Sequence, residues 1–172
     1  MGIKDQGVTE TAGRWLSIPR TLCFITHGDD VLLLKRSPHQ RIFPNRYNGV
    51  GGHIERDEDP LSGVVREVQE ETGLDVHDVR LRGVIHVDAG DPQIGILVFV
   101  FSAQANSREF TDSVEGTLEW VARERVDELP LVDDLPMLLP LALDAPTDAP
   151  PFFAHTSYDE QDRIRFILAN PL

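Results

Sequence analysis

Apolar residues recur at the spacing of a helix in one stretch of the chain, residues 60–73. The apolar residues of that stretch are Leu61, Val64, Val65 and Val68. They repeat at i, i+3, i+4 and i+7, which predicts a helix with one apolar face directed at a core. Asp57 to Pro60 places acidic residues and a first-turn proline at its start, and Gly73 is typical of a helix end.

The remaining apolar runs are short and rich in β-branched and aromatic residues, which predicts strands. These runs cover residues 20–26, 31–35, 79–87, 94–102, 117–121, 152–158 and 163–168. Residues 131–143 are apolar enough for a packed helix, although Pro136 and Pro140 interrupt them. Strands before and after one strongly patterned helix, with a second helical region later, predict an α+β fold with a mixed central sheet between helices.

Length and local composition set the expected domain organisation. At 172 residues the chain suits one domain with a sizeable core. Residues 1–18 are polar and carry no hydrophobic period, so we expect a flexible N-terminal arm there. Residues 19–172 are then expected to form a single domain.

Charge and cysteine content narrow the expected partners and compartment. The net charge is −13 at pH 7, which argues against binding to nucleic-acid polymers and acidic membranes, because a polyanion would be repelled. Cys23 is the only cysteine and lies in an apolar run, which fits a buried thiol in a reducing cytoplasm. The longest apolar run, residues 94–103, is shorter than the about 20 residues that a membrane helix needs. We therefore expect a soluble cytoplasmic protein, either a monomer or a homodimer.

Three glutamates crowd one flank of the predicted helix. At about 100° per residue, Glu67, Glu70 and Glu71 fall within an arc of roughly 100° beside the apolar face. Like charges three and four residues apart repel, so a cation among them would stabilise the helix. Magnesium takes oxygen ligands and is usually shared between carboxylates and substrate phosphates. The glutamates alone leave two interpretations open, a metal site and a solvated acidic face.

A fixed spacing extends this cluster into a longer motif. The residues that carry it are Gly52, Glu58, Arg66, Glu67, Val68, Glu70, Glu71, Gly73 and Leu74. They follow G-x5-E-x7-R-E-U-x-E-E-x-G-U, with U an apolar residue. Residues 52–74 therefore resemble the Nudix box, and the chain resembles a Nudix hydrolase. The resemblance implies an α/β/α sandwich in which the box supplies a loop, the helix and a second loop.

The resemblance also implies a metal site. Glu67, Glu70 and Glu71 would hold Mg²⁺, for which Mn²⁺ could substitute, and the Gly52 carbonyl would add a further oxygen. In the family, water attacks a phosphorus in a nucleoside diphosphate linked to another group, and the metal orients and activates the reactants. Glu70 and Glu71 are on this basis counted among the catalytic residues as well as the metal ligands.

The other matching residues divide into structural and catalytic groups. Glu58 and Arg66 match positions that support the loop–helix–loop through an ion pair, and Gly73 ends the helix. A base must also accept the proton of the attacking water. Two candidates for that base stay open, Glu71 within the box and Glu115 ahead of the strand at residues 117–121. For Glu115 the alternative is an exposed loop carboxylate.

Similarity to the branch that hydrolyses oxidised purine nucleoside triphosphates extends outside the box. The candidate substrate-binding residues are Thr21, Lys35, Arg36, Asn48, Asp133 and Asp134. Carboxylates and an amide can read a donor–acceptor edge such as that of guanine. Helix capping by Asp133 and Asp134 and a turn role for Asn48 stay open as alternatives. The branch stacks the base on aromatic residues, and the matching positions here are Val87, Ala89 and Leu131.

These observations predict a Mg²⁺-dependent pyrophosphohydrolase with a small-molecule nucleotide as its substrate. The expected substrate is a purine nucleoside triphosphate, oxidised purines included, which would be cut to a monophosphate and pyrophosphate. One alternative is a pyrophosphatase for ADP-ribose, coenzyme A or another nucleoside diphosphate derivative. An alternative of another class is a catalytically silent Nudix module that binds a nucleotide.

Overall fold

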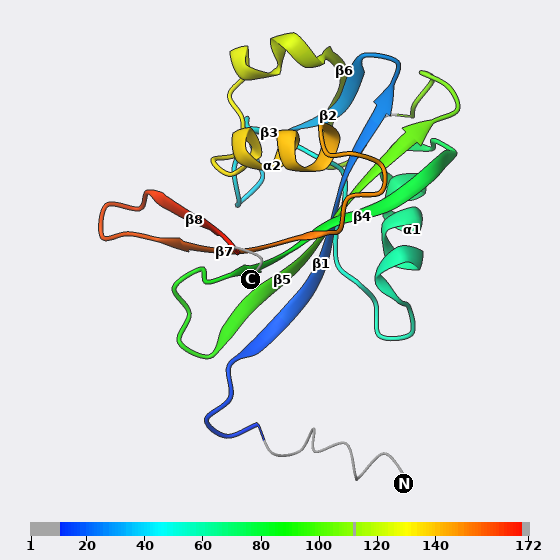
Figure 1. Ribbon diagram of the computed structural model, residues 1–172. Helices are drawn as coiled ribbons and strands as arrows, with labels where there is room; N and C mark the ends of the chain where they lie inside the picture. Colours follow the sequence, from blue (N-terminus) through cyan, green and yellow to red (C-terminus); the bar gives the residue numbers. More distant parts are fainter. Residues whose placement is uncertain (1–10, 112, 170–172) are drawn as a thin grey trace, which may run out of the picture.

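An eight-stranded mixed sheet forms the centre of the protein, as the computed structural model shows over residues 11–111 and 113–169 (Figure 1). Its strands are β1 (Leu16–His27), β2 (Asp30–Arg36), β3 (Tyr47–Asn48), β4 (Val76–Val87), β5 (Ile94–Ala105), β6 (Gly116–Ala122), β7 (Phe152–Tyr158) and β8 (Ile164–Leu168). The order is β3-β2-β1-β5-β4-β7-β8, and β6 pairs with β2. β1 is parallel to β5 and β4 is parallel to β7, while the other pairs are antiparallel. The predicted mixed sheet is confirmed.

Helices cover the two faces of this sheet. α1 (Pro60–Thr72) lies against one face and α2 (Leu135–Leu143) against the other (Figure 1). A 3-10 helix, η2 (Arg123–Glu128), precedes α2. Successive strand residues point to opposite faces, so β1 sends Phe24 into the core under α2 and Ile25 into the core under α1. The α+β sandwich expected from the sequence is therefore confirmed.

The first strand begins earlier than predicted. The flexible arm was expected to reach residue 18, yet β1 starts at Leu16, and Leu16 and Ile18 pair with Ile94 and Ile96 of β5. The prediction is wrong for residues 16–18 because β5 is long enough to offer these residues a parallel partner. Residues 1–10 of the expected arm lie outside the described residues.

Helix α1 begins and ends where the sequence indicates. The Asp59 side chain accepts hydrogen bonds from the amides of Leu61 (2.8 Å) and Ser62 (3.1 Å), and Pro60 opens the first turn. Gly73 ends the helix in the left-handed region, with φ of 69°. These caps fix the ends of the helix, which follows the glycine-rich loop at residues 49–54.

The buried face of α1 differs from the expected apolar face. Val64 and Val68 are buried, but Leu61 is 50% exposed and Val65 is 43% exposed. The helix is rotated so that its glutamate flank faces the protein, and the Glu67 side chain is only 14% exposed. The prediction of one apolar face over all four residues is thus wrong, because part of the contact surface of α1 consists of carboxylates.

No helix within the described ranges, 11–111 and 113–169, is long and apolar enough to cross a membrane. The helix predicted over residues 131–143 begins only at Leu135, because Leu131 forms a bridge with Tyr47 and the Val132 amide donates to the Tyr47 carbonyl at 3.0 Å. Pro136 lies in its first turn, where no helical donor is lost, and Pro140 lies inside it.

Candidate active site

A close approach between the glycine-rich loop and α1 defines the site. Residues 50 and 53 of the loop form isolated bridges with Cys23 and Arg20 of β1, so the loop is fixed on the sheet. A Cβ at Gly52 would lie 2.5–2.6 Å from the Glu67 carboxylate, so any side chain at this position would displace that carboxylate. The Gly52 carbonyl accepts a hydrogen bond from the Thr21 amide at 2.8 Å.

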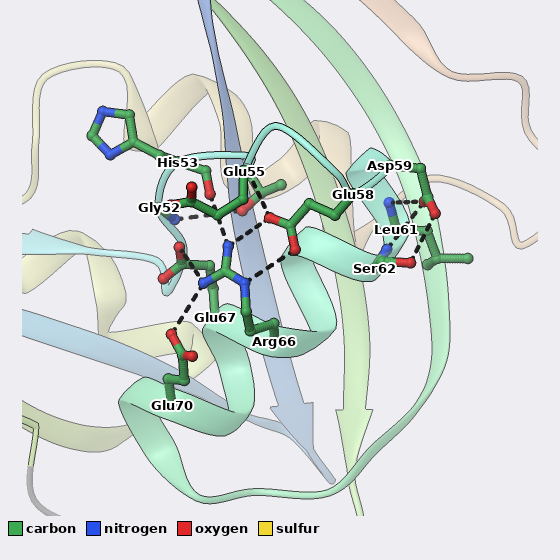
Figure 2. Close-up of polar contacts among 11 residues, drawn as sticks. Gly52, His53, Glu55, Glu58, Asp59, Leu61, Ser62, Arg66, Glu67 and Glu70 are labelled. Atoms are coloured by element: carbon green, nitrogen blue, oxygen red, sulfur yellow. Dashed lines mark hydrogen bonds and ion pairs between the residues drawn. The ribbon is translucent and has the colours of Figure 1, made fainter.

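Arg66 is at the centre of a polar network that connects the loop with α1 (Figure 2). Its Nε and Nη2 donate to the two oxygens of Glu58, at 3.1 and 2.6 Å. Nη2 also donates to the His53 carbonyl, and Nη1 donates to Glu67 and to Glu70, at 3.0 Å in each case. Arg66 lowers the pKa of the Glu58 carboxyl, chiefly through these hydrogen bonds. The ion pair expected for the box therefore also extends to the candidate metal ligands.

Glu71 occupies the inner side of the helix. Its Oε2 accepts a hydrogen bond from the Gly51 amide at 3.2 Å. Burial raises the pKa of Glu71 to about 7, and the charges of Glu115 and Glu67 act in the same direction, while Gly51 and Arg36 oppose them. A partly buried carboxyl group whose pKa is raised in this way is a candidate for proton transfer or metal binding.

The candidate metal ligands are close together but do not form a finished cage. Within residues 11–111 and 113–169, no three His, Cys, Asp or Glu side chains are arranged to hold a metal ion. Glu67 and Glu70 instead share Arg66, and the Glu70 side chain is 61% exposed. The structure thus brings Glu67 and Glu71 towards the loop and leaves Glu70 at the surface.

The donor chemistry nevertheless fits a hard divalent cation. Glu67, Glu71 and the Gly52 carbonyl are oxygen donors, which Mg²⁺ prefers. The Gly52 oxygen uses one lone pair on Thr21 and keeps the other. Burial, together with the charges of Glu115 and Glu67, makes Glu71 costly to ionise, and a cation would offset that cost. The Glu67 carboxylate occupies the space that a side chain at residue 52 would take.

A cavity of about 460 Å³ adjoins the box. Among the sequence-predicted site residues, those that line it are Thr21, Arg36, Asn48, Gly52, Glu115, Asp133 and Asp134. They come from β1, β2, β3, the loops around α1 and β6, and the start of α2, so the fold brings distant segments together. A larger cavity of about 650 Å³ lies between η2 and α2 and contains none of these residues.

Lys35 is placed differently from the other predicted substrate-binding residues. It does not line the cavity, and its ammonium lies 5.6 Å from the centre of the Tyr47 ring. It stands in β2 between Leu34 and Arg36, both of which line the cavity. Because strand residues alternate between the two faces of a sheet, Lys35 points away when its neighbours point in.

The polar residues of the cavity have different local partners. Asn48 Oδ1 accepts from the Gly49 amide at 2.9 Å, so the side chain takes the turn role and also borders the cavity. Asp134 occupies the N-cap position of α2, yet its side chain makes no capping hydrogen bond. Burial raises the pKa of Asp134, and Asp133 adds to the effect. Asp133 pairs with Arg46 at 3.3 Å.

Glu115 reaches the site through strand pairing. Arg36 at the end of β2 is opposite Gly116 of β6, which brings the preceding residue, Glu115, beside the Arg36 guanidinium at 3.8 Å. The Glu115 side chain is 42% exposed and lines the cavity, and its charge raises the pKa of Glu71. Glu115 therefore lies near enough to Glu71 for the two carboxylates to repel each other.

Several cavity residues were not anticipated from the sequence. Phe43 and Tyr158 supply aromatic surface, although the positions expected to carry it are Val87, Ala89 and Leu131. Val87 and Ala89 do line the cavity, whereas Leu131 does not. Phe43 has a positive φ of 51°, uncommon for a bulky residue. For Phe43, the aromatic residues in the loop at residues 37–48 were the one signal in the sequence. The position of Tyr158 depends on the pairing of β7 with β4, which is distant in sequence.

Comparisons with known proteins agree with this geometry. The NUDIX domain model matches residues 17–144. The oxidized purine nucleoside triphosphate hydrolase of Mus musculus is 31% identical over 123 residues, which are 69% of this chain and 74% of that protein. The MutT protein from Bacillus halodurans superimposes with a TM-score of 0.73 at 25% identity, over 90% of this chain and 99% of that one.

Other relatives are much longer than the matching segment. An m7GpppN-mRNA hydrolase of Xenopus laevis is 39% identical over 70 residues, which are 41% of this chain and only 24% of that protein. A match of this kind spans less than half of this chain and about a quarter of the relative, so it does not identify the substrate. The family model, by contrast, covers well over half of the chain and includes both the box and the strands that support it. This chain belongs to the Nudix family.

Proposed function

We propose that this protein is a Mg²⁺-dependent pyrophosphohydrolase that cuts a purine nucleoside triphosphate, oxidised purines included, to a nucleoside monophosphate and pyrophosphate. One observation carries the proposal. A single cavity is bordered at one end by the box, with Gly52 and Glu115, and elsewhere by Asn48, Asp133 and Asp134. Phosphates and a purine edge could thus be bound together. The matched mouse relative, named for oxidised purine nucleoside triphosphates, supports the same assignment.

The box end supplies the chemistry in this proposal. Glu67, Glu71 and the Gly52 carbonyl would hold Mg²⁺, with Glu70 joining them from the surface. The bound metal would neutralise phosphate charge and lower the pKa of the attacking water. Glu71 is the proposed acceptor of the water's proton, because its carboxylate is held at the Gly51 amide next to Gly52 and beside the other proposed metal ligand, Glu67. Glu115, which lines the cavity, is the alternative candidate for this base.

The other end of the cavity supplies selectivity. Asp134 has a raised pKa and no capping bond, so its carboxyl group is available as a donor or acceptor for a base edge. Asn48 keeps its amide nitrogen available, because only its oxygen is bound to Gly49. Phe43 and Tyr158 would pack against the base and replace the missing aromatics at residues 87, 89 and 131.

A phosphate-release screen with Mg²⁺ and a coupled pyrophosphatase tests the proposal. We expect purine triphosphates to be turned over and Glu71→Gln to lower kcat by about 10²- to 10⁴-fold with folding retained. Turnover restricted to ADP-ribose, coenzyme A or other linked diphosphates would replace the triphosphate assignment. Nucleotide binding without any turnover would show a silent binding module instead.

A further inference from the structure

Arg20 carries a buried polar atom that no other group in the described protein satisfies. Its Nε is shielded from solvent and has no hydrogen-bond partner. No ion pair of Arg20 occurs among residues 11–111 and 113–169, although both Asp133 and Asp134 border the same cavity. A buried donor left without an acceptor destabilises the free protein, and a bound ligand would remove that cost.

The position of Arg20 points it into the candidate active site. It lines the cavity, and in β1 it is on the same face as Leu22, which packs in the core under α2. Its neighbour in β5 is Val98, so Arg20 lies between two apolar residues that also line the cavity, Leu22 and Val98. A cation in apolar surroundings is normally paired with an anion.

The main chain of Arg20 lies beside the loop of the box. Arg20 forms a bridge with His53, and the next residue, Thr21, donates its amide to the Gly52 carbonyl. The Glu67 carboxylate also lies against Gly52. The side chain therefore starts at the end of the cavity where the phosphate groups of a nucleotide would meet the metal ligands.

We propose that Arg20 binds the phosphate chain of the substrate, a role that rests on the proposed function of the cavity. A guanidinium presents several donors and pairs strongly with phosphate oxygens. It would also offset repulsion between those phosphates and the carboxylate of Glu115, which lines the same cavity. Arg20 contacts the substrate in the ground state and the transition state alike, so it acts mainly on binding.

The test compares Arg20→Gln with wild type and with Arg14→Gln, a matched control at an exposed arginine outside the cavity. Binding of inorganic tripolyphosphate is measured by calorimetry, alongside KM and kcat for GTP with Mg²⁺. We expect Arg20→Gln to raise the tripolyphosphate Kd and the KM by about 10- to 100-fold with kcat nearly unchanged. Arg20→Lys should recover part of the loss, and inhibition by guanosine should stay the same.

Two results would overturn the inference. The first is that Arg20→Gln binds tripolyphosphate as tightly as wild type. If the thermal stability of this variant falls while its tripolyphosphate binding is unchanged, Arg20 has a structural role and the inference is overturned. A weaker guanosine interaction with intact tripolyphosphate binding would place Arg20 at the nucleoside instead. If wild-type protein hydrolyses no triphosphate at all, the proposed function fails, while the tripolyphosphate comparison still decides whether Arg20 holds a phosphate chain.

Discussion

Replacing Glu71 with glutamine should stabilise the metal-free protein while abolishing its response to magnesium. Burial, Glu115 and Glu67 raise the pKa of Glu71 from the ordinary 4.5 to about 7. The folded state thus binds a proton more tightly than the unfolded state, and ionising Glu71 costs folding free energy. The cost is absent below about pH 4.5, grows as the pH rises towards 7, and is complete above that.

The size of the effect follows from the shift in pKa. Each pKa unit is worth about 1.4 kcal/mol, so the full shift corresponds to an upper bound of about 3 kcal/mol. Glutamine keeps an oxygen that can accept from the Gly51 amide, so this hydrogen bond need not be lost. Because Glu71 is only partly buried, solvent screens its charge, and we expect about 1–2 kcal/mol in practice. For a domain of this length that is a rise in Tm of roughly 2–8 °C.

Thermal unfolding in EDTA, followed between about pH 4.5 and 8.5, measures this difference. The Glu71→Gln variant should be more stable than wild type at about pH 8, and the gap should close towards about pH 5. Adding Mg²⁺ should reverse the order, because only wild type gains stability from the bound ion. Two results would refute the argument that Glu71 is a buried carboxyl close to other carboxylates. One is a variant that is less stable than wild type at high pH in EDTA, and the other is a difference in stability that does not change with pH.

Three further changes separate the parts of the site. Gly52→Ala should displace the Glu67 carboxylate, which a Cβ would approach within 2.6 Å, and weaken Mg²⁺ activation about 10-fold or more in a metal titration. Arg66→Gln should lower the Tm, because the network of carboxylates loses its cation; an unchanged Tm would show that the ion pairs contribute nothing. Asp134→Asn should change KM ratios between purine and pyrimidine triphosphates by about 10-fold with folding intact, whereas equal ratios would exclude base reading by Asp134.

The sequence predicts the box well because the relevant interactions are local. Asp59, Pro60 and Gly73 act within a turn of the helix ends, and the glutamates follow one another at helical spacing. The rotation of α1 could not be predicted in the same way. Hydrophobic periodicity assumes that the buried face is apolar, whereas here Glu67 is packed against a glycine and is more buried than Val65.

The substrate end of the cavity depends on pairings between distant segments. Tyr158 reaches the cavity because β7 pairs in parallel with β4, so that its position follows from a register that no short pattern encodes. Burial and the charges of Asp134 and Asp133 raise the pKa of Tyr158, which shows that residues from β7 and from the start of α2 meet there. Arg20 is a comparable case, since an arginine in a β-strand is ordinarily read as an exposed charge.

The three side-chain nitrogens of Arg66 contact different parts of the site. Nε and Nη2 hold Glu58 and the His53 carbonyl, and so fix the loop that carries Gly52. Nη1 alone contacts Glu67 and Glu70. A cation that takes over these two carboxylates can therefore replace the Nη1 contacts while the other two nitrogens keep the loop in place. This separation explains how one arginine can stabilise an acidic cluster without metal and still leave its carboxylates available for one.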